Sequence, residues 1–289
     1  MSFVITTDSM CDLPESYLKE HDVKAVSLSF TIDGQTYDES NILAGKEFYD
    51  KMRQGAMPAT SQFSPGKAKD FFEAIIKEKN CDILHISFSS GLSGSYNSAL
   101  IAAQELEDEY PDRKITIVDS LAASLGEGLL VYYAVDMMEN GKSMEEVYTW
   151  LSENKLNLCH IFTLDDLECL QRGGRVSKTA AVVGGVLKIK PLMHVDDDGK
   201  LVPFDKVRGW KNALNSVVDR MEKTIGNRKD DNKIIFISHG DVLEDAEYVR
   251  DRIKERLGFD SFLINFVGPA IGCHTGAGVV ALFYLGEYR

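Results

Sequence analysis

The residues best placed for chemistry form a turn rich in serine and glycine, SSGLSGSYNSA, over residues 89–99. An apolar run before it predicts a strand and the run after it predicts a helix, so the turn would join the two. Gly91 and Gly94 let backbone N–H groups approach a ligand closely, and Ser93 adds a hydroxyl donor. With the positive end of the following helix, these groups favour an anion site, although Ser95 capping that helix would explain part of the pattern.

This turn does not match the common nucleotide-binding loops, because no Gly-Lys-Ser/Thr follows it and GLSG lacks the third glycine of a dinucleotide fingerprint. It is closer to the GxSxG elbow of serine hydrolases, with Ser95 in place of the second glycine. One alternative is therefore a serine esterase in which Ser93 attacks, His274 is the base and Asp241 orients the base. Another is a module that binds a sugar or a phosphate at the same turn.

A second hydroxyl cluster, in TSQFSP, places Thr60, Ser61 and Ser64 ahead of a predicted helix that Pro65 would open. Ser64 as the N-cap of that helix explains one hydroxyl of the three. A third cluster, in TTDSMCDLPESY, follows the first predicted strand, and we interpret it as a capping residue with a tight turn.

His274 lies in a glycine-rich segment, GPAIGCHTGAG, whose small residues would leave its ring accessible to a ligand. The remaining histidines show no HExxH or other metal-ligand spacing, and DDDG lacks the later ligands of a calcium loop, so no metal is expected. The segment RGGRVSK concentrates Arg172, Arg175 and Lys178 in an otherwise acidic chain. These cations fit either a helix end or a contact with a phosphate or a partner.

In the first half of the chain, short apolar runs alternate with helical patterns. The predicted strands are FVITT, KAVSLSF, DILHISF and KITIVD, and the predicted helices span 64–79, 95–109 and 122–139. Such alternation is typical of βαβ units, hence of a parallel sheet with helices on both faces. Ligands bind such sheets at the carboxyl ends of the strands, where the serine-glycine turn would lie.

Near residue 157 this rhythm changes. Two strands flanking DDDG predict a β-hairpin. The other predicted elements are the strand LCHIFTL, a short polar helix before RGGRVSK, helices over 209–225 and 242–256, and strands over 233–238 and 260–267. We therefore predict an α/β fold of two closely packed domains: an N-terminal three-layer domain with a parallel sheet over 1–160, and a C-terminal α+β domain with a mixed sheet over 161–289.

Composition limits the partners and the compartment. The chain has 32 Lys and Arg against 45 Asp and Glu, a net charge of -13, which would repel nucleic acid. Five cysteines form no CxxC pair, and free thiols are typical of the reducing cytoplasm, where we expect the protein. The N-terminus has no basic leader of a signal peptide. The uncharged run 261–286 is long enough to cross a membrane, but its glycines, proline and histidine predict strand, loop and buried element instead.

Taken in chain order, the motifs TDSMCDL, TSQFSP, SSGLSGSYNSA and GPAIGCHTGAG, with LECLQRGGRVSK and LKIKPLM between them, resemble those of the DegV family of bacterial fatty-acid-binding proteins. The match runs from about Asp8 to Gly278. The resemblance implies one long-chain fatty acid buried between two domains, and no cofactor. It further implies that the chain is not itself an enzyme but the acyl-carrying subunit of a fatty acid kinase, whose partner uses ATP to phosphorylate the carboxyl, with transient contact to a membrane surface.

By matching motif, the resemblance assigns five residues to the fatty acid carboxylate: Thr60, Ser61, Ser93, Gly94 and His274. Arg172 and Arg175 match the family's RGGR and would face the acyl phosphate or the kinase. Phe63 and Ala277 depart from the proline and the glycine that are usual in the family at these positions.

Physical chemistry supports the same interpretation. Removing ~14 methylenes from water at ~0.8 kcal/mol each gives roughly 11 kcal/mol of gross driving force. A carboxylate taken out of water needs several hydrogen-bond donors, which the serines and glycines would supply.

Overall fold

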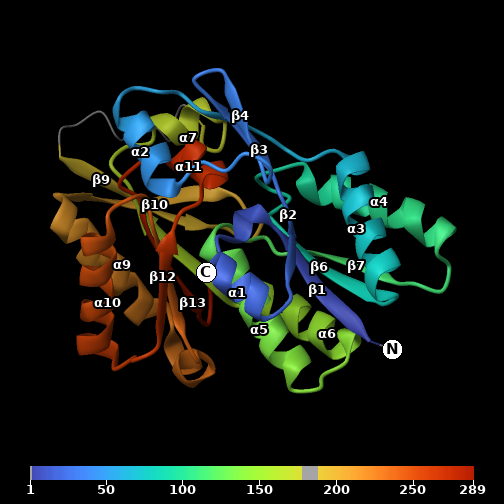
Figure 1. Cartoon of the computed structure of the whole chain (residues 1–289). Helices are drawn as coiled ribbons and strands as arrows, with labels where there is room; N and C mark the ends of the chain where they lie inside the picture. The colour runs from blue at the N-terminus through green and yellow to red at the C-terminus, as the bar shows by residue number, and fades with distance from the viewer. Residues whose placement is uncertain (1, 178–187) are drawn as a thin grey trace.

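The computed structural model describes residues 2–177 and 188–289, and three β-sheets organise this part of the chain (Figure 1). The first sheet has four parallel strands in the order β2-β1-β6-β7. Its strands are β1 (Phe3–Asp8), β2 (Lys24–Val26), β6 (Asp82–Ser87) and β7 (Ile115–Asp119). The short helices η1 (Ser9–Cys11) and α1 (Glu15–Glu20) connect β1 to β2.

Helices cover both faces of the parallel sheet, as the sequence predicts. One face carries α3 (Pro65–Lys79) and α4 (Ser95–Glu109), and the other carries α5 (Leu125–Glu139) and α6 (Met144–Asn154) (Figure 1). Ser64 caps α3 by accepting a hydrogen bond from Lys67 N at 3.2 Å. Ser143 and Glu146 form a capping box at the start of α6, a helix that we did not predict.

The second sheet has six strands in the order β10-β9-β8-β13-β11-β12, antiparallel except for the β11–β12 pair. Its strands are β8 (Leu158–Thr163), β9 (Ile189–Val195), β10 (Leu201–Arg208), β11 (Ile235–His239), β12 (Phe262–Phe266) and β13 (Val280–Leu285). Helices α9 (Trp210–Thr224) and α10 (Leu243–Leu257) pack on one face. The short helices η2 (Lys155–Asn157) and η4 (Gly226–Asp231) lead into β8 and β11. The mixed sheet and the hairpin at DDDG are thus confirmed.

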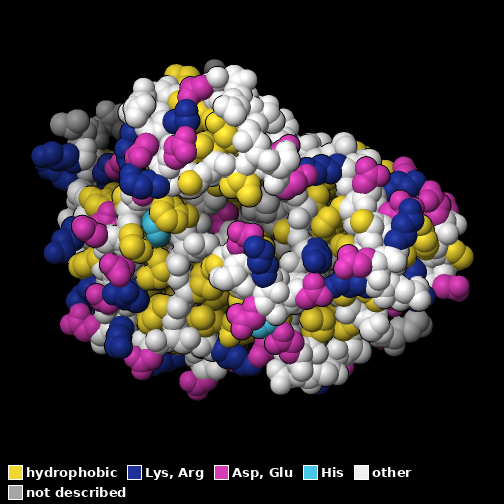
Figure 2. All heavy atoms as spheres, viewed as in Figure 1, with side chains coloured by type: hydrophobic (Ala, Val, Ile, Leu, Met, Phe, Trp, Pro, Cys, Tyr) yellow, Lys and Arg dark blue, Asp and Glu magenta, His cyan; other side chains and the backbone are white. Residues whose placement is uncertain are grey.

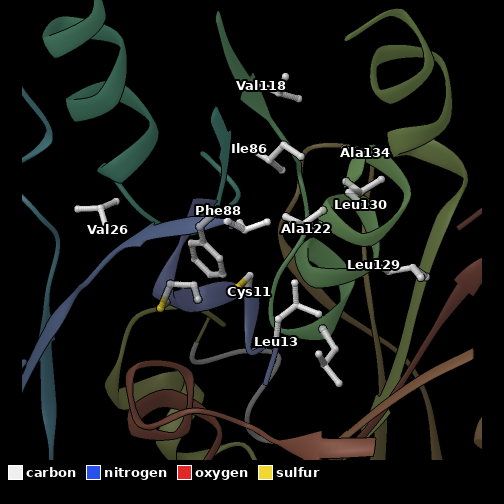
Figure 3. Packing of buried hydrophobic residues seen from close by; sticks show 14 of the residues in the cluster. Cys11, Leu13, Val26, Ile86, Phe88, Val118, Ala122, Leu129, Leu130 and Ala134 are labelled. Carbon is white, nitrogen blue, oxygen red and sulfur yellow. The ribbon is translucent and has the colours of Figure 1, made fainter. Parts of the chain in front are cut away.

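Helix α5 joins the two sheets. It contacts β1 and β6 of the parallel sheet and β8, β11 and β13 of the mixed sheet. Its residues from Leu125 to Val131 are all buried, and all of them except Glu127 are apolar, as expected for a helix packed between two sheets. Figure 3 shows part of the resulting cluster, in which α5 contributes Leu129, Leu130 and Ala134. The two halves of the chain therefore share a continuous core, in agreement with the predicted close packing.

The third sheet was not predicted. It is antiparallel in the order β4-β3-β5, with strands β3 (Ser29–Ile32), β4 (Gln35–Tyr37) and β5 (Ala59–Ser61). It packs with α2 (Gly45–Arg53) and α11 (Pro269–Thr275) around Phe30, Phe48, Tyr49 and Cys273. The predicted strand KAVSLSF is split between β2 and β3, because the backbone N–H of Leu28 donates to Ser9 Oγ at 2.9 Å instead of to a strand.

The predicted boundary between residues 160 and 161 falls inside β8, all of which pairs within the six-stranded sheet. We propose that the second unit begins just before Leu158. The uncharged run 261–286 forms β12, α11 and β13, in agreement with the prediction of strand, loop and buried element. Among the described residues, no helix combines the length and the apolar character needed to cross a membrane.

Candidate ligand-binding site

A cavity of about 390 Å³ lies between the two halves of the chain. Its first wall consists of residues that follow three strands of the parallel sheet: Met10 after β1, Phe88 after β6 and Ala123 after β7. The cavity therefore occupies the carboxyl ends of parallel strands, where ligands are expected in such sheets.

The mixed sheet forms the second wall. Phe162 on β8 lies opposite Ala281 on β13, and His160 lies opposite Phe283, and all four line the cavity. Side chains alternate between the faces of a strand, so the residues between them, including Ile161, point into the core beneath α9 and α10. One face of this sheet thus supports the fold while the other borders the cavity.

Helix α11 forms the third wall. Ile271, His274 and Thr275 line the cavity, at the i, i+3 and i+4 spacing that places residues on one helix face. The cavity therefore follows the length of α11.

Polar side chains from four segments surround one end of the cavity, and we call them the polar ring: Thr60, Gln62, Ser93, Arg175 and His274. Thr60 Oγ1 lies 2.9 Å from His274 Nε2. Gln62 packs so closely on Gly94 that a Cβ there would lie 2.9 Å from Gln62 Cδ. These contacts connect β5, the serine-glycine turn and α11 around a common space.

Arg175 completes the polar ring. Its guanidinium donates to the Leu92 carbonyl at 3.0 Å, directly before Ser93, and to the Gly173 carbonyl. Among the residues that the structure describes, its hydrogen bonds reach only backbone carbonyls, so its positive charge has no carboxylate partner there. Burial lowers the pKa of Arg175. A half-buried cation of this kind is suited to an anionic ligand group.

Ser93 lies at the start of α4, but the helix is not capped as the sequence predicts. Gly94 is the N-cap and Ser95 is the first helical residue. Ser93 Oγ accepts a hydrogen bond from Ser95 N at 3.2 Å and lies 3.0 Å from Ser95 Oγ. The hydroxyl of Ser93 is thereby held at the cavity wall.

His274 is held neutral by its surroundings. Burial, together with the charges of Arg175 and Arg172, lowers the pKa of His274 to about 4. Its Nδ1 is buried, has no hydrogen-bond partner within 2–177 and 188–289, and faces Gly173, where any Cβ would overlap the ring. At neutral pH the imidazole therefore acts as a hydrogen-bonding group and not as a charge.

Two of the residues assigned from the resemblance do not line the cavity. Ser61 is exposed, because it neighbours Thr60 on β5 and so points to the opposite face of the strand. Arg172, at the end of α7 (Glu168–Arg172), is exposed, and its guanidinium donates to Cys169 Sγ at 3.5 Å. Lys178 lies outside the described residues. Thr60, Ser93, Gly94, His274 and Arg175 do lie together around the cavity.

The hydrogen bonds of an esterase triad are not formed among the described residues. Ser93 Oγ bonds to Ser95, and His274 bonds to Thr60 instead of to Ser93. Asp241 pairs with Arg53 instead of orienting the histidine. The esterase prediction therefore loses the geometry that it required.

The tip of the β9–β10 hairpin contacts the serine-glycine turn. Ser89 Oγ donates to the Gly199 carbonyl at 2.8 Å. Gly91 lies so close to the hairpin that a Cβ would stand 2.9 Å from the Gly199 carbonyl oxygen. Gly91 therefore allows the turn to pack against the second unit, a role that we did not predict.

Sequence reasoning also missed three residues that line the cavity, Gln62, Ser124 and Ser238, and Gly173, which packs against His274. Gln62 and Gly173 lie inside motifs that the sequence had already singled out. Ser124 follows β7 and could have been found from the rule that ligands bind at strand ends. Ser238 lies within a strand and gave no signal. Phe63 and Ala277, the two departures from the family pattern, do not line the cavity.

Comparison with known proteins gives a consistent result. The family model described as "Uncharacterised protein, DegV family" matches residues 2–287. A DegV domain-containing protein of Clostridium perfringens is 46% identical over 289 residues, which cover 99% of this chain and 98% of that protein. A stearic acid-binding protein of Eubacterium ventriosum has a similar structure, with a TM-score of 0.90, 28% identity and coverage of 99% of each chain. DegV of Bacillus subtilis, described as a fatty acid binding protein, has a TM-score of 0.85 at 27% identity, again over 99% of each chain. This chain belongs to the DegV family.

Proposed function

We propose that this protein binds one long-chain fatty acid in the cavity, with the tail against the apolar walls and the carboxylate in the polar ring. The observation that carries the proposal is a cavity of about 390 Å³ whose mainly apolar walls end in a group of hydroxyl, imidazole and guanidinium donors. This volume is typical of sites for small organic ligands. The stearic acid-binding neighbour from Eubacterium ventriosum supports the same ligand class.

The free energy of binding would come from the tail and its specificity from the headgroup. Burial of ~14 methylenes contributes roughly 11 kcal/mol before the costs of association. An ionised carboxylate in the same cavity is stable only with donors and favourable charge around it. Arg175 supplies that charge, and the polar ring supplies the donors.

The hydrogen bonds of the polar ring leave two hydroxyl protons for the ligand. Ser93 Oγ accepts from Ser95 N, and when Ser95 Oγ donates to it as well, the proton of Ser93 can point to a carboxylate oxygen. If the neutral ring of His274 carries its proton on Nε2, it donates to Thr60 Oγ1, and Thr60 donates its own proton to the ligand. His274 then orients Thr60.

In this proposal the chain performs no chemistry of its own and presents the carboxylate to a partner kinase. A carboxylate oxygen would attack the γ-phosphorus of ATP held by that partner, the bond to the bridging oxygen would break, and ADP would leave. Arg175 lies beside the cavity and Arg172 is exposed on the surface, and we propose that they meet the acyl phosphate or the kinase. The missing esterase geometry favours this carrier function.

Mass spectrometry of a solvent extract of the purified protein tests the binding proposal. We expect a long-chain fatty acid in the extract, and added oleate or palmitate should raise the melting temperature of delipidated protein. Ser93→Ala should weaken binding, whereas Ser90→Ala, an exposed serine in the same turn, should not. An empty extract together with no response to either acid would overturn the proposal, and steady ester hydrolysis lost in Ser93→Ala would favour the esterase.

The kinase part has its own test. Loaded protein is incubated with ATP and a bacterial fatty acid kinase subunit, and the acyl phosphate is trapped with hydroxylamine as a hydroxamate. We expect Arg172→Ala to bind the fatty acid normally and to yield less hydroxamate. If no acyl phosphate forms with the bound fatty acid, the carrier function is wrong even though binding stands.

A further inference from the structure

The cavity contains a second polar group, separate from the polar ring. Ser124 and Ser238 line the cavity and are only 5% and 0% exposed. Ser124 Oγ lies 2.5 Å from Asp12 Oδ2, to which it donates, and 3.1 Å from Ser238 Oγ. We call the two residues the serine pair. A purely apolar tail would make no use of two hydroxyls in the wall beside it.

The separation between the serine pair and the polar ring can be estimated along the axis of α11. Asp12 Oδ1 accepts a hydrogen bond from Gly268 N at 3.0 Å, at the start of α11, whereas His274 lies near its end. Six residues at 1.5 Å per residue separate these two points by roughly 9 Å along the helix axis. Because the cavity follows α11, a fatty acid with its carboxylate in the polar ring would pass the serine pair partway along its chain.

The number of protons sets what the serine pair can bind. Ser124 has one hydroxyl proton and cannot donate to both of its neighbours at once. An ionised Asp12 can only accept, so the proton of Ser124 lies on that bond. Ser238 must then provide the proton between the two serines. Within the described part of the chain, no other side-chain hydrogen bond of Ser238 is formed, so its oxygen can accept one from the cavity.

We propose that the serine pair is a subsite for a hydroxyl group carried in the middle of the fatty acid chain. The inference rests on the proposed function, and it extends the ligand class to hydroxylated long-chain fatty acids. A hydroxyl at the right carbon donates to Ser238 Oγ. A keto oxygen at the same carbon only accepts and finds no donor, and a methylene forms no hydrogen bond.

A purely structural role for these residues makes a different prediction. Asp12 directly follows η1, Ser124 is the N-cap of α5 and Ser238 lies on β11, so their hydrogen bonds also hold the two units together. If that were their only function, loss of Ser238 would change the binding of every fatty acid by the same factor. The subsite predicts a loss confined to one hydroxylated ligand.

The test titrates delipidated protein with stearate, with hydroxystearates that carry the hydroxyl at successive mid-chain carbons, and with the matching ketostearates. It is run at about pH 8.5, because burial raises the pKa of Asp12 to about 7 and the carboxylate is ionised above that value. We expect one hydroxy acid to bind more tightly than its positional isomers and its keto counterpart. Ser238→Ala should lower the affinity for that hydroxy acid by roughly 2- to 12-fold and leave the affinity for stearate unchanged. Ser98→Ala, a buried serine on α4 away from the cavity, is the matched control and should alter neither.

Asp12→Asn tests the direction of the protons. The asparagine can accept from Gly268 N and donate from Nδ2 to Ser124, so that Ser124 donates to Ser238 and the proton of Ser238 points into the cavity. The variant should prefer the keto acid to the hydroxy acid. Three results would each overturn the subsite: equal affinity for all hydroxy isomers, a loss of stearate affinity in Ser238→Ala as large as the loss for the hydroxy acid, or an unchanged ligand preference in Asp12→Asn. In each of these cases, binding of stearate to the wild type would still support the proposed function. No stearate binding at all would overturn both.

Discussion

Thr60 and His274 are 214 positions apart in the sequence, yet Thr60 Oγ1 lies 2.9 Å from His274 Nε2 at the end of the cavity. The contact connects the third sheet, which belongs to the first half of the chain, to α11 in the second half. A ligand headgroup bound there would contact both halves at once.

Replacement of Thr60 by valine keeps the shape of the side chain and removes its hydroxyl. We expect fatty acid affinity to fall by roughly 2- to 12-fold, since one hydrogen bond to the carboxylate is lost. Isothermal titration of the delipidated variant measures the change. Ser61→Ala, on the opposite face of the same strand, is the control and should bind as tightly as the wild type. A loss in Ser61→Ala as large as in Thr60→Val would contradict the geometry described for β5.

Replacement of Gly173 by alanine should disturb the site without removing a polar group. The new Cβ would overlap Nδ1 of His274 and stand 3.1 Å from Cε1, so the ring must move and release Thr60. We expect weaker fatty acid binding with little change in secondary structure by circular dichroism. Gly66→Ala, where the nearest atom lies 3.8 Å from the added Cβ, should bind normally. Normal binding by Gly173→Ala would show that the position of His274 is unimportant.

Replacement of Gly91 by alanine should weaken the contact between the two units. The added Cβ meets the Asp198 and Gly199 carbonyl oxygens, so the hairpin tip must withdraw and the hydrogen bond from Ser89 is strained. Overpacking of this kind costs about 1–3 kcal/mol. The free energy of unfolding from urea denaturation should fall by that amount. An unchanged midpoint would mean that the hairpin tip adapts freely.

The buried carboxyl of Asp12 should make stability depend on pH. Burial raises its pKa from 3.8 to about 7, although the hydrogen bonds from Ser124 and Gly268 oppose the shift. Between these two pH values the folded state holds a proton that the unfolded state releases, so this contribution to stability declines as pH rises through the window. The full contribution is on the order of 4 kcal/mol. Urea denaturation across this range should show a steeper decline for the wild type than for Asp12→Asn. Parallel profiles would mean that Asp12 titrates normally in the folded protein.

Local signals in the sequence were enough to predict most helices and strands. Ser64 and Pro65 mark the start of α3, and the residues around Leu129 predict a helix over 122–139. These features depend on neighbouring residues along the chain, so no knowledge of the tertiary structure was needed. The parallel sheet, the mixed sheet and the position of the site at strand ends follow from the order of such elements.

The remaining features depend on contacts between distant segments. Strands β3 to β5 are three or four residues long and gain their stability from α2 and α11, so their sequences carry little periodic signal. Without β5, the alternation that separates Thr60 from Ser61 could not be seen. The serine pair joins positions 124 and 238, and only the assembled fold brings them together.

The most direct test of the central claim is a crystal structure of the protein as purified. The account predicts continuous, elongated electron density along α11, with a carboxylate within hydrogen-bond distance of Ser93 and Thr60 and the tail against Phe162 and Phe283. An empty cavity in protein that has been shown to carry a fatty acid, or a fatty acid bound elsewhere on the molecule, would contradict it.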